Sequence, residues 1–270
     1  MSSNGRFFRR KCNELTVLSS LATRFRSRQH VLSAWVGSPD PTNAAILAAE
    51  DFDAVTFDMQ HGAVDLAGVI RGIPLVQAAG KPALARIPVG EFQTVSKLFD
   101  AGASAVIAPM VNSMSDAQKF VNFAKYPPLG GRSWGPFASM PASGLEPNAY
   151  LKTANSFSLA IAMIETREAM AIVDEILAVE GIDAVLVGPS DLSIALSGGA
   201  HVDANHPDVD KALSHVVSRA HAAGKAACVY AVSPERAALF RRMGFDFVAL
   251  MGDAPLLKLG AQAAIRTARA

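Results

Sequence analysis

The chain has 270 residues, half of them hydrophobic and 18% charged, with a formal net charge of +1 and a mean hydropathy of +0.24. This balance gives no reason to expect nucleic acid or a membrane as a partner, and no stretch approaches the roughly 18 consecutive apolar residues of a membrane span. The two cysteines, Cys12 and Cys228, lie far apart without metal-ligand spacing, which favours a reducing, cytoplasmic setting.

The first thirty residues are rich in arginine and poor in acids. A targeting sequence would need an apolar stretch followed by a small-residue cleavage site, and this segment has none. We therefore expect a basic tail over residues 1–20, running into a first helix over about Asn13–Ser27. Residues 21–270 are expected to form one domain.

From Val31 onward, short apolar runs alternate with amphipathic helical stretches. The predicted strands are Val31–Val36, Ala54–Asp58, Ala83–Ile87, Ala105–Pro109, Leu159–Ile164, Ala184–Val187, Ala226–Tyr230 and Phe247–Leu250. The predicted helices between them include Asp65–Ala79, Glu91–Ala101, Ser115–Ala124, Arg167–Val179, Pro207–Ala223 and Pro234–Met243. Five glycines, Gly80, Gly102, Gly181, Gly224 and Gly244, fall where helix C-caps are expected. Eight such alternations predict an α/β protein with a single parallel (β/α)8, or TIM, barrel.

A doubly wound open sheet is the main alternative fold. Such a sheet usually carries a glycine-rich phosphate loop after an early strand, and none of the strand exits here has that pattern. The count of eight strands also favours a closed barrel.

One connection is much longer than the others. Between the fourth and fifth strands, residues 126–156 are rich in proline and glycine and carry the aromatic residues Tyr126, Trp134, Phe137 and Tyr150. Because long loops in compact domains are usually functional, this excursion is expected to act as a lid or an oligomer contact rather than as a second domain.

Polar residues gather where the predicted strands end. Asp58, Gln60 and His61 follow the second strand, Arg86 closes the third, and Glu165 follows the fifth. The sixth strand is followed by Gly188, Pro189, Ser190 and Asp191. Catalytic groups of parallel barrels come from these strand ends, so we expect them to share one mouth.

Glu165 and Asp191 are the candidate metal ligands. They follow consecutive strands, and two carboxylates completed by substrate oxygens and water suit a hard cation such as Mg²⁺ or Mn²⁺. Either residue alone could instead be a helix-capping acid, because helix N-termini favour carboxylates. Their occurrence beside His61 and Arg86 favours the metal site.

His61 and Arg86 are the candidate catalytic residues. An imidazole at the mouth suits proton transfer near neutral pH, and a guanidinium can stabilise a developing oxyanion. Lys81 and Lys225 precede their strands, and no lysine follows one. This pattern points away from imine chemistry and toward an enolate held by a metal.

Several segments resemble the HpcH/HpaI aldolase family of class II, metal-dependent pyruvate aldolases, which includes 2,4-dihydroxyhept-2-ene-1,7-dioate and 2-keto-3-deoxy-sugar-acid aldolases. They are DMQHG (58–62), ARIP (85–88), KLFDAGA (97–103), APMV (108–111), YPPLGGRSWGP (126–136), IET (164–166) and VEGIDAVLVGPSDLS (179–193). The resemblance extends from about Leu21 to the C-terminus. It implies a barrel of the phosphoenolpyruvate/pyruvate superfamily and, more distantly, a relation to the citrate lyase beta subunit.

The resemblance also implies roles for individual residues. Glu165 and Asp191 would ligate Mg²⁺ or Mn²⁺, with Co²⁺ as a further option, and the metal would chelate the keto acid. Arg86 would stabilise the enolate, and His61 would accept the proton. The substrate carboxylate would bind the backbone N–H of Ser190, beside Gly188 and Pro189. Asp58 and Gln60 would support these groups from behind.

Three positions qualify the resemblance. Asp100, in KLFDAGA, matches an acid that raises the basicity of the histidine. Its helix end lies on the rim opposite the mouth, so Asp100 would act at a neighbouring subunit's site or else is simply an acid at a helix end. Gln60 replaces a glutamate that the family commonly has, which removes a negative charge. Met163 replaces a common glutamine and removes a polar contact to substrate.

The sequence thus predicts an aldolase that reversibly cleaves a 4-hydroxy-2-oxo acid to pyruvate, or a close analogue such as hydroxypyruvate, and an aldehyde. The alternatives are a CoA-thioester lyase of the citrate lyase beta type and a non-catalytic barrel that binds keto acids or metal. The resemblance further implies a homo-oligomer, a trimer or hexamer, with a C-terminal helix over Leu256–Ala268 docked on a neighbour.

Overall fold

The computed structural model describes residues 16–270, and its strands form one closed barrel. The strands are β1 (Val31–Val36), β2 (Ala54–Asp58), β3 (Ala83–Arg86), β4 (Ala105–Ala108), β5 (Leu159–Ile164), β6 (Ala184–Val187), β7 (Ala226–Ala231) and β8 (Phe247–Gly252). All neighbouring strands are parallel, and β8 pairs with β1. The predicted barrel is confirmed, and every predicted strand agrees with the observed one to within two residues.

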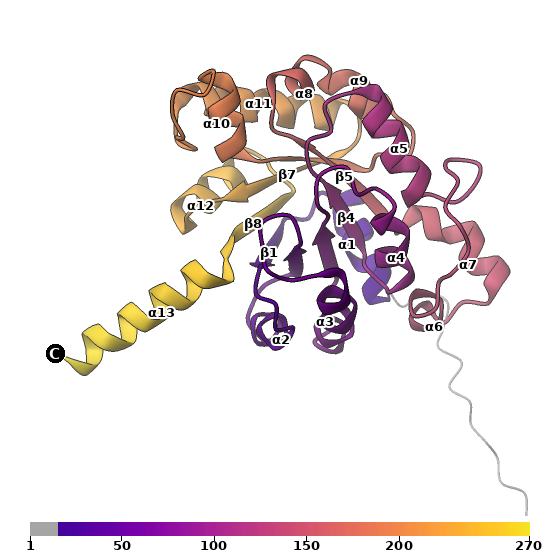
Figure 1. Cartoon of the computed structure of the whole chain (residues 1–270), viewed down its shortest axis with the longest axis horizontal. Coiled ribbons are helices and arrows are strands. Elements are labelled where there is room, and N and C mark those ends of the chain that lie inside the picture. The colour runs from indigo at the N-terminus through magenta and orange to yellow at the C-terminus, as the bar shows by residue number, and fades with distance from the viewer. Residues whose placement is uncertain (1–15) are drawn as a thin grey trace, which may run out of the picture.

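Helices surround the barrel, as Figure 1 shows. They are α1 (Val17–Arg26), α2 (Thr42–Ala49), α3 (Leu66–Ala78), α4 (Thr94–Asp100), α5 (Met114–Ala124), α6 (Ser139–Ser143), α7 (Pro147–Thr153), η1 (Ala154–Ser156), α8 (Arg167–Ala171), α9 (Val173–Ala178), α10 (Pro189–Leu196), α11 (Pro207–Ala222), α12 (Pro234–Arg242) and α13 (Asp253–Ala268). All five predicted capping glycines have positive φ. The predicted helix over Arg167–Val179 is instead divided at Ile172 into α8 and α9.

The predicted N-terminal tail falls largely outside the described residues. Its residues 17–20 belong to α1, which ends at Arg26, and residues 1–15 are not described. Cys12 lies in that part of the chain, whereas Cys228 is a buried free thiol on β7. No helix within residues 16–270 combines the length and apolar character needed to cross a bilayer.

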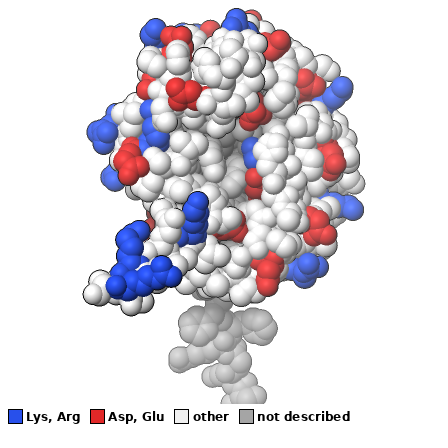
Figure 2. All heavy atoms as spheres, turned by 60° about the vertical axis from the view of Figure 1, so that its left-hand side comes forward, with Lys and Arg blue, Asp and Glu red and all other residues white. Residues whose placement is uncertain are grey.

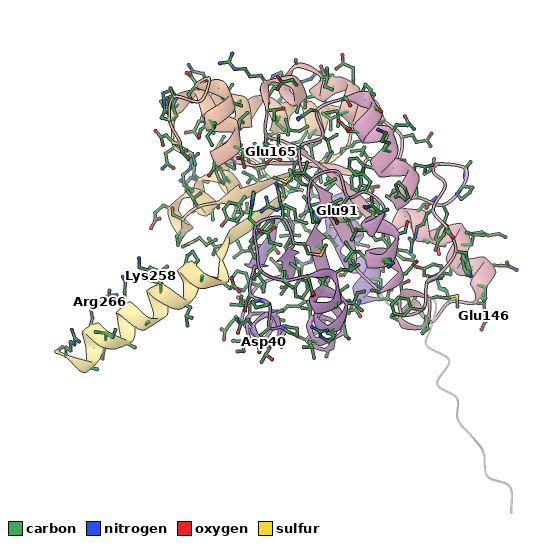
Figure 3. The ribbon with its side chains drawn as sticks, in the orientation of Figure 1. Asp40, Glu91, Glu146, Glu165, Lys258 and Arg266 are labelled. Atoms are coloured by element: carbon green, nitrogen blue, oxygen red, sulfur yellow. The ribbon has the colours of Figure 1, made fainter. Side chains whose placement is uncertain are left out.

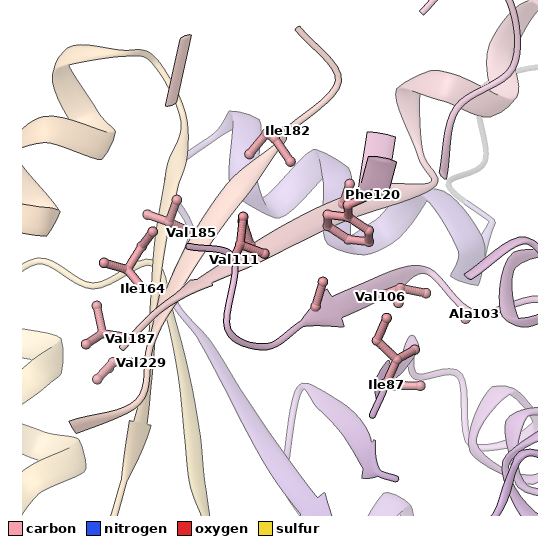
Figure 4. Packing of buried hydrophobic residues seen from close by; sticks show 14 of the residues in the cluster. Ile87, Ala103, Val106, Val111, Phe120, Ile164, Ile182, Val185, Val187 and Val229 are labelled. Carbon is pink, nitrogen blue, oxygen red and sulfur yellow. The ribbon is translucent and has the colours of Figure 1, made fainter. Parts of the chain in front are cut away.

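Two apolar layers stabilise the barrel. One lies between the strands and the outer helices, where Val185, Val187 and Ile164 pack side by side, as Figure 4 shows. The other fills the barrel interior with residues such as Leu84 and Ile161. Burial on both faces explains why the strands are continuous apolar runs in the sequence.

Helix α1 closes the N-terminal end of the barrel. Leu18, Leu21 and Phe25 pack against the interior layer. Arg24 pairs with Asp53, which precedes β2, and Arg26 donates to the carbonyl of Ser156, which precedes β5. These contacts leave the opposite end, where the strands exit, as the mouth of the barrel.

The excursion between β4 and β5 packs at the closed end. Tyr126 and Tyr150 are buried in the same interior layer as α1, and α6 lies against α1. The segment does not act as a lid over the mouth of its own barrel, because Tyr126 and Tyr150 pack at the opposite end. The interpretation as an oligomer contact stays a prediction. Trp134 and Phe137 remain about half or more exposed.

Candidate active site

The pleat of the strands selects which side chains enter the mouth. On β2, Val55 and Phe57 face the outer helices, so Ala54, Thr56 and Asp58 face the interior. By the same alternation, Arg86 on β3 points inward. Two charged side chains thus end adjacent strands on the inside of a barrel whose deeper layers are apolar.

A cleft with a volume of about 1380 Å³ opens at this end of the barrel. The predicted site residues that line it are Asp58, His61, Arg86, Met163, Gly188, Pro189, Ser190 and Asp191. Residues from α2 and α13 extend the cleft outward with apolar side chains, including Ile46 and Leu257. These eight residues therefore converge on one cavity, whereas the predicted site residues Glu165 and Gln60 are not among those that line it.

Arg86 and Asp58 form a buried, bidentate ion pair. Arg86 Nε donates to Asp58 Oδ1 at 2.8 Å and Nη2 donates to Oδ2 at 2.7 Å, while the guanidinium stacks over the Trp35 ring. Burial alone would favour the neutral acid, but the hydrogen bonds and charge of Arg86 outweigh it and hold the pKa of Asp58 below its ordinary value. Nη1 of Arg86 has only the Met163 sulfur at 4.0 Å, so this nitrogen is available to a ligand.

The turn after β2 presents His61 to the cleft. Asp58 Oδ1 accepts hydrogen bonds from the backbone N–H groups of Gln60 and His61, at 3.1 and 3.3 Å. The imidazole itself is exposed at the cleft wall. Gln60 is half-buried, and its Oε1 is buried without a hydrogen-bond partner. Asp58 thus orients both the guanidinium and the turn that carries the imidazole.

Glu165 is the most deeply buried carboxylate of the site, in the middle of the fold in Figure 3. Oε1 accepts the backbone N–H of Met110 at 2.9 Å, but Oε2 is buried without a partner. Burial raises the pKa of Glu165 to about 7; the Met110 N–H opposes this shift, the charge of Asp191 adds to it, and Arg86 opposes it. A buried carboxylate oxygen with no partner, beside a second carboxylate, fits a cation-binding role.

Asp191 and Ser190 lie in the first turn of α10, directly after β6. Pro189 occupies the start of this helix, where its missing N–H costs nothing, and backbone N–H groups of the first turn are free to bind an anion. Within residues 16–270 no three His, Cys, Asp or Glu side chains cluster as a complete metal site would. A cation at Glu165 and Asp191 would therefore need oxygens from substrate or water, as the sequence predicts.

Gly188 leaves room for the Glu165 carboxylate. A Cβ at this position would lie 2.6 Å from Glu165 Oε2 and 3.1 Å from Met163 Cε. We therefore expect Gly188→Ala to displace the carboxylate and to weaken Mn²⁺ binding by about 10-fold or more, as loss of a ligand-orienting contact does. Isothermal titration with Mn²⁺ measures this effect, and wild-type affinity in the variant would contradict it.

Asp100 does not join this cluster. It ends α4 before β4 and pairs with the buried Arg132, whose Nη2 lies 2.6 Å from Asp100 Oδ1. Its backbone carbonyl accepts the N–H of Ala138 in the excursion. Within one chain, Asp100 is therefore at the opposite end of the barrel from His61.

Three groups at the mouth were not predicted from the sequence. Tyr230 and Trp35 point inward from the ends of β7 and β1 and meet edge to face at 5.3 Å, and both line the cleft. Burial raises the pKa of the Tyr230 phenol, which keeps it a neutral hydrogen-bond donor. The third is Asp253, at the start of α13. The rule of inspecting each strand exit would have found Tyr230, had aromatic residues been included.

The sequence profile described as HpcH/HpaI aldolase/citrate lyase matches residues 32–257. The chain belongs to this family. The matched range runs from β1 into the start of α13, and it contains all the cleft residues named above.

Individual proteins are similar to this chain over most of its length. A hydroxypyruvate/pyruvate aldolase of Rhizorhabdus wittichii is 38% identical over 94% of this chain and 100% of its own length. A 2-keto-3-deoxy-L-rhamnonate aldolase of Klebsiella pneumoniae is 31% identical over 83% of this chain and 84% of its own length. The crystal structure of a family protein from Burkholderia cenocepacia superposes with a TM-score of 0.84 at 28% identity, covering 93% of this chain and 100% of that chain.

Proposed function

We propose that the chain is a divalent-metal-dependent aldolase that reversibly cleaves 4-hydroxy-2-oxo acids to pyruvate, or to hydroxypyruvate, and an aldehyde. The names of its relatives support a substrate of this class. The observation that carries the metal dependence is the buried Glu165 carboxylate, with one free oxygen, next to Asp191 and Arg86. In this proposal residues 21–270 are the catalytic domain.

The chain's own residues supply binding and proton transfer. The Ser190 N–H binds the substrate carboxylate, and His61 takes the proton of the 4-hydroxyl group as the bond between C3 and C4 breaks. The electron pair of that bond passes toward the 2-oxygen, where the free Nη1 of Arg86 donates to the growing negative charge. The proton is then returned to C3, which gives the 2-oxo acid, and the aldehyde leaves.

Glu165 and Asp191 would hold the cation, Mg²⁺, Mn²⁺ or Co²⁺. When bound, it would act as a Lewis acid that polarises the 2-oxo group. Asp58 and Gln60 support the catalytic turn, and Met163 and Pro189 form the wall beside the 2-oxo acid. Any catalytic role of Asp100 would be at the active site of a neighbouring subunit.

Pyruvate release from a panel of hydroxy-oxo acids, with and without Mn²⁺, tests the proposal. We expect cleavage that EDTA abolishes and that Mn²⁺ or Mg²⁺ restores. Cleavage at the full rate by EDTA-treated protein would contradict metal dependence. Absence of cleavage across the panel, together with tight binding of pyruvate, would instead favour a binding protein.

The other mechanisms are less consistent with the cleft. Among the described residues that line it, Arg86 is the sole lysine or arginine, whereas a CoA thioester needs basic groups for its phosphates. On the face of the molecule that Figure 2 shows, acidic and basic side chains are also interspersed over the barrel. None of those lining residues is a lysine, so no lysine is placed to form an imine with pyruvate there. Treatment with borohydride and pyruvate, which reduces such an imine, is therefore expected to leave the enzyme active.

We further propose that the chain assembles as a homo-oligomer, a trimer or hexamer, through α13. This helix projects from the fold in Figure 1, and none of its sixteen residues is buried. Leu257 is 76% exposed and Ile265 is 49% exposed, on a helix that a single chain does not cover. A neighbouring copy would cover this surface.

The double variant Leu257→Asp/Ile265→Asp tests this assembly. We expect analytical ultracentrifugation to show a smaller species than the wild type, because two charges would enter an apolar contact. Val202→Asp is the control, since Val202 is 66% exposed, between Leu257 and Ile265, but lies in the loop after α10. Identical sedimentation of all three proteins would contradict the role of α13.

A further inference from the structure

Asp253 connects the end of β8 to the loop between β1 and α2. Its Oδ1 accepts the backbone N–H of Gly37 at 3.2 Å and its Oδ2 accepts that of Ser38 at 3.0 Å. Both carboxylate oxygens therefore accept hydrogen bonds from two successive backbone amides of a neighbouring loop. Asp253 is also a wall residue of the cleft.

That loop is in turn packed on the turn that carries His61. The carbonyl of Gly37 accepts the N–H of Ala63 at 2.7 Å. A Cβ on Gly62 would lie 2.6 Å from Gly37 Cα and 2.2 Å from the Asp58 carbonyl oxygen, so the two glycines touch backbone to backbone. A shift of Gly37 is consequently transmitted to the residue that follows His61.

A bulge in β8 places Asp253 over this loop. Along β1 and β8, Ala34 is paired with Leu250 but Trp35 is paired with Gly252, so Met251 is the extra residue. Met251 has a φ of 45°, in the left-handed region that side chains other than glycine rarely adopt. Such strain is retained where the surrounding structure requires it, and bulges near active sites re-aim the residues beyond them.

We propose that Asp253 is a positioning residue. It fixes the loop at Gly37, which contacts Gly62, and so keeps the imidazole of His61 in the position required for proton transfer. The inference rests on the proposed role of His61 as the proton acceptor. The two candidate metal ligands are held elsewhere: Glu165 accepts the N–H of Met110, and Asp191 lies on α10. Loss of the Asp253 carboxylate should therefore affect proton transfer and leave cation binding intact.

A double-mutant cycle on kcat tests this proposal. Asp253→Ala is expected to lower kcat by about 10- to 100-fold, the effect of misplacing a reactive group by about 1 Å. The KM for the hydroxy-oxo acid and the Kd for Mn²⁺ should change by less than about twofold. In a His61→Ala background the same substitution should change kcat by less than about twofold, because no imidazole remains to be positioned.

Controls separate positioning from general damage. Asp40→Ala removes a different carboxylate from the same loop, and it should leave kcat unchanged. Asp40 is hydrogen-bonded to Thr42 and lies at the edge of the fold in Figure 3. Asp253→Asn keeps one acceptor oxygen and should lose less activity than Asp253→Ala, with both melting temperatures measured. If Asp253→Asn is the only variant that folds, a kcat equal to the wild type overturns the proposal.

Failure of the positioning role and failure of the proposed function give different results. Equal losses of kcat from Asp253→Ala in the wild-type and His61→Ala backgrounds, or weakened Mn²⁺ binding, would overturn the positioning role alone. Wild-type kcat in His61→Ala would overturn the proposed catalytic role of His61.

Discussion

Replacement of Arg86 by alanine is expected to reduce kcat by about 100- to 1000-fold, the usual cost of removing a donor to a developing oxyanion. It should also destabilise the fold by about 3–5 kcal/mol, because Asp58 would be left as a buried carboxylate without its partner. Steady-state kinetics and urea unfolding at neutral pH measure the two effects. Since Arg86 holds the pKa of Asp58 low, stability that the pair contributes is present at neutral pH and is lost as Asp58 protonates in acid.

A second variant separates the two effects. Asp58→Asn combined with Arg86→Met removes both charges, so most of the stability should return while kcat stays low. Recovery of activity in this double variant would contradict a direct role of the Arg86 guanidinium. A single Arg86→Ala variant as stable as the wild type would contradict the structural part of the argument.

Glu165→Gln is expected to weaken Mn²⁺ binding by about 100-fold or more, because a ligand counts for more than the groups that merely orient it. Cleavage activity should fall in parallel. The pKa of about 7 adds a pH dependence: below that pH Glu165 carries a proton that the cation must displace, so wild-type affinity for Mn²⁺ should fall as the pH drops below 7. Calorimetric titration at several pH values measures this slope.

The matched control is Glu168→Gln. Glu168 is exposed in the first turn of α8, three residues beyond Glu165, and does not line the cleft. Its replacement by glutamine removes the same charge as Glu165→Gln does. It should bind Mn²⁺ like the wild type. Equal affinity of the Glu165→Gln and wild-type proteins would remove Glu165 from the metal site.

The strands could be predicted from the sequence because parallel strands buried on both faces are continuous apolar runs. Helices α2 and α10 were not predicted, and neither were α6, α7 and η1 within the excursion between β4 and β5. Helix α2 is largely alanine and has no clear polar face, and α10 begins directly at the exit of β6, where Pro189–Asp191 looks like a loop. The division of α8 from α9 at Ile172 also leaves no signal in the apolar periodicity.

The candidate site could be predicted where it consists of polar side chains that end strands. Asp58, Arg86 and Glu165 satisfy that condition, and the inward positions of the pleat bring them together. The Met110 N–H that holds Glu165 is a backbone group and has no sequence signature. Asp253 was missed because the bulge at Met251, which aims it at Gly37, depends on pairing between distant strands.

The two walls of the cleft differ in how they are built. Beside His61, Gly37 and Gly62 touch through their backbones, and a Cβ added at Gly62 would lie 2.6 Å from Gly37 Cα, so a larger residue there would move the turn. Elsewhere in the cleft, Met163 and Tyr230 contribute side chains to a lining that also includes Gly188 and Gly252. Substrate range could therefore be engineered at Met163 and Tyr230 by substitution, whereas the glycine wall is a fixed reference against which any new aldehyde must fit.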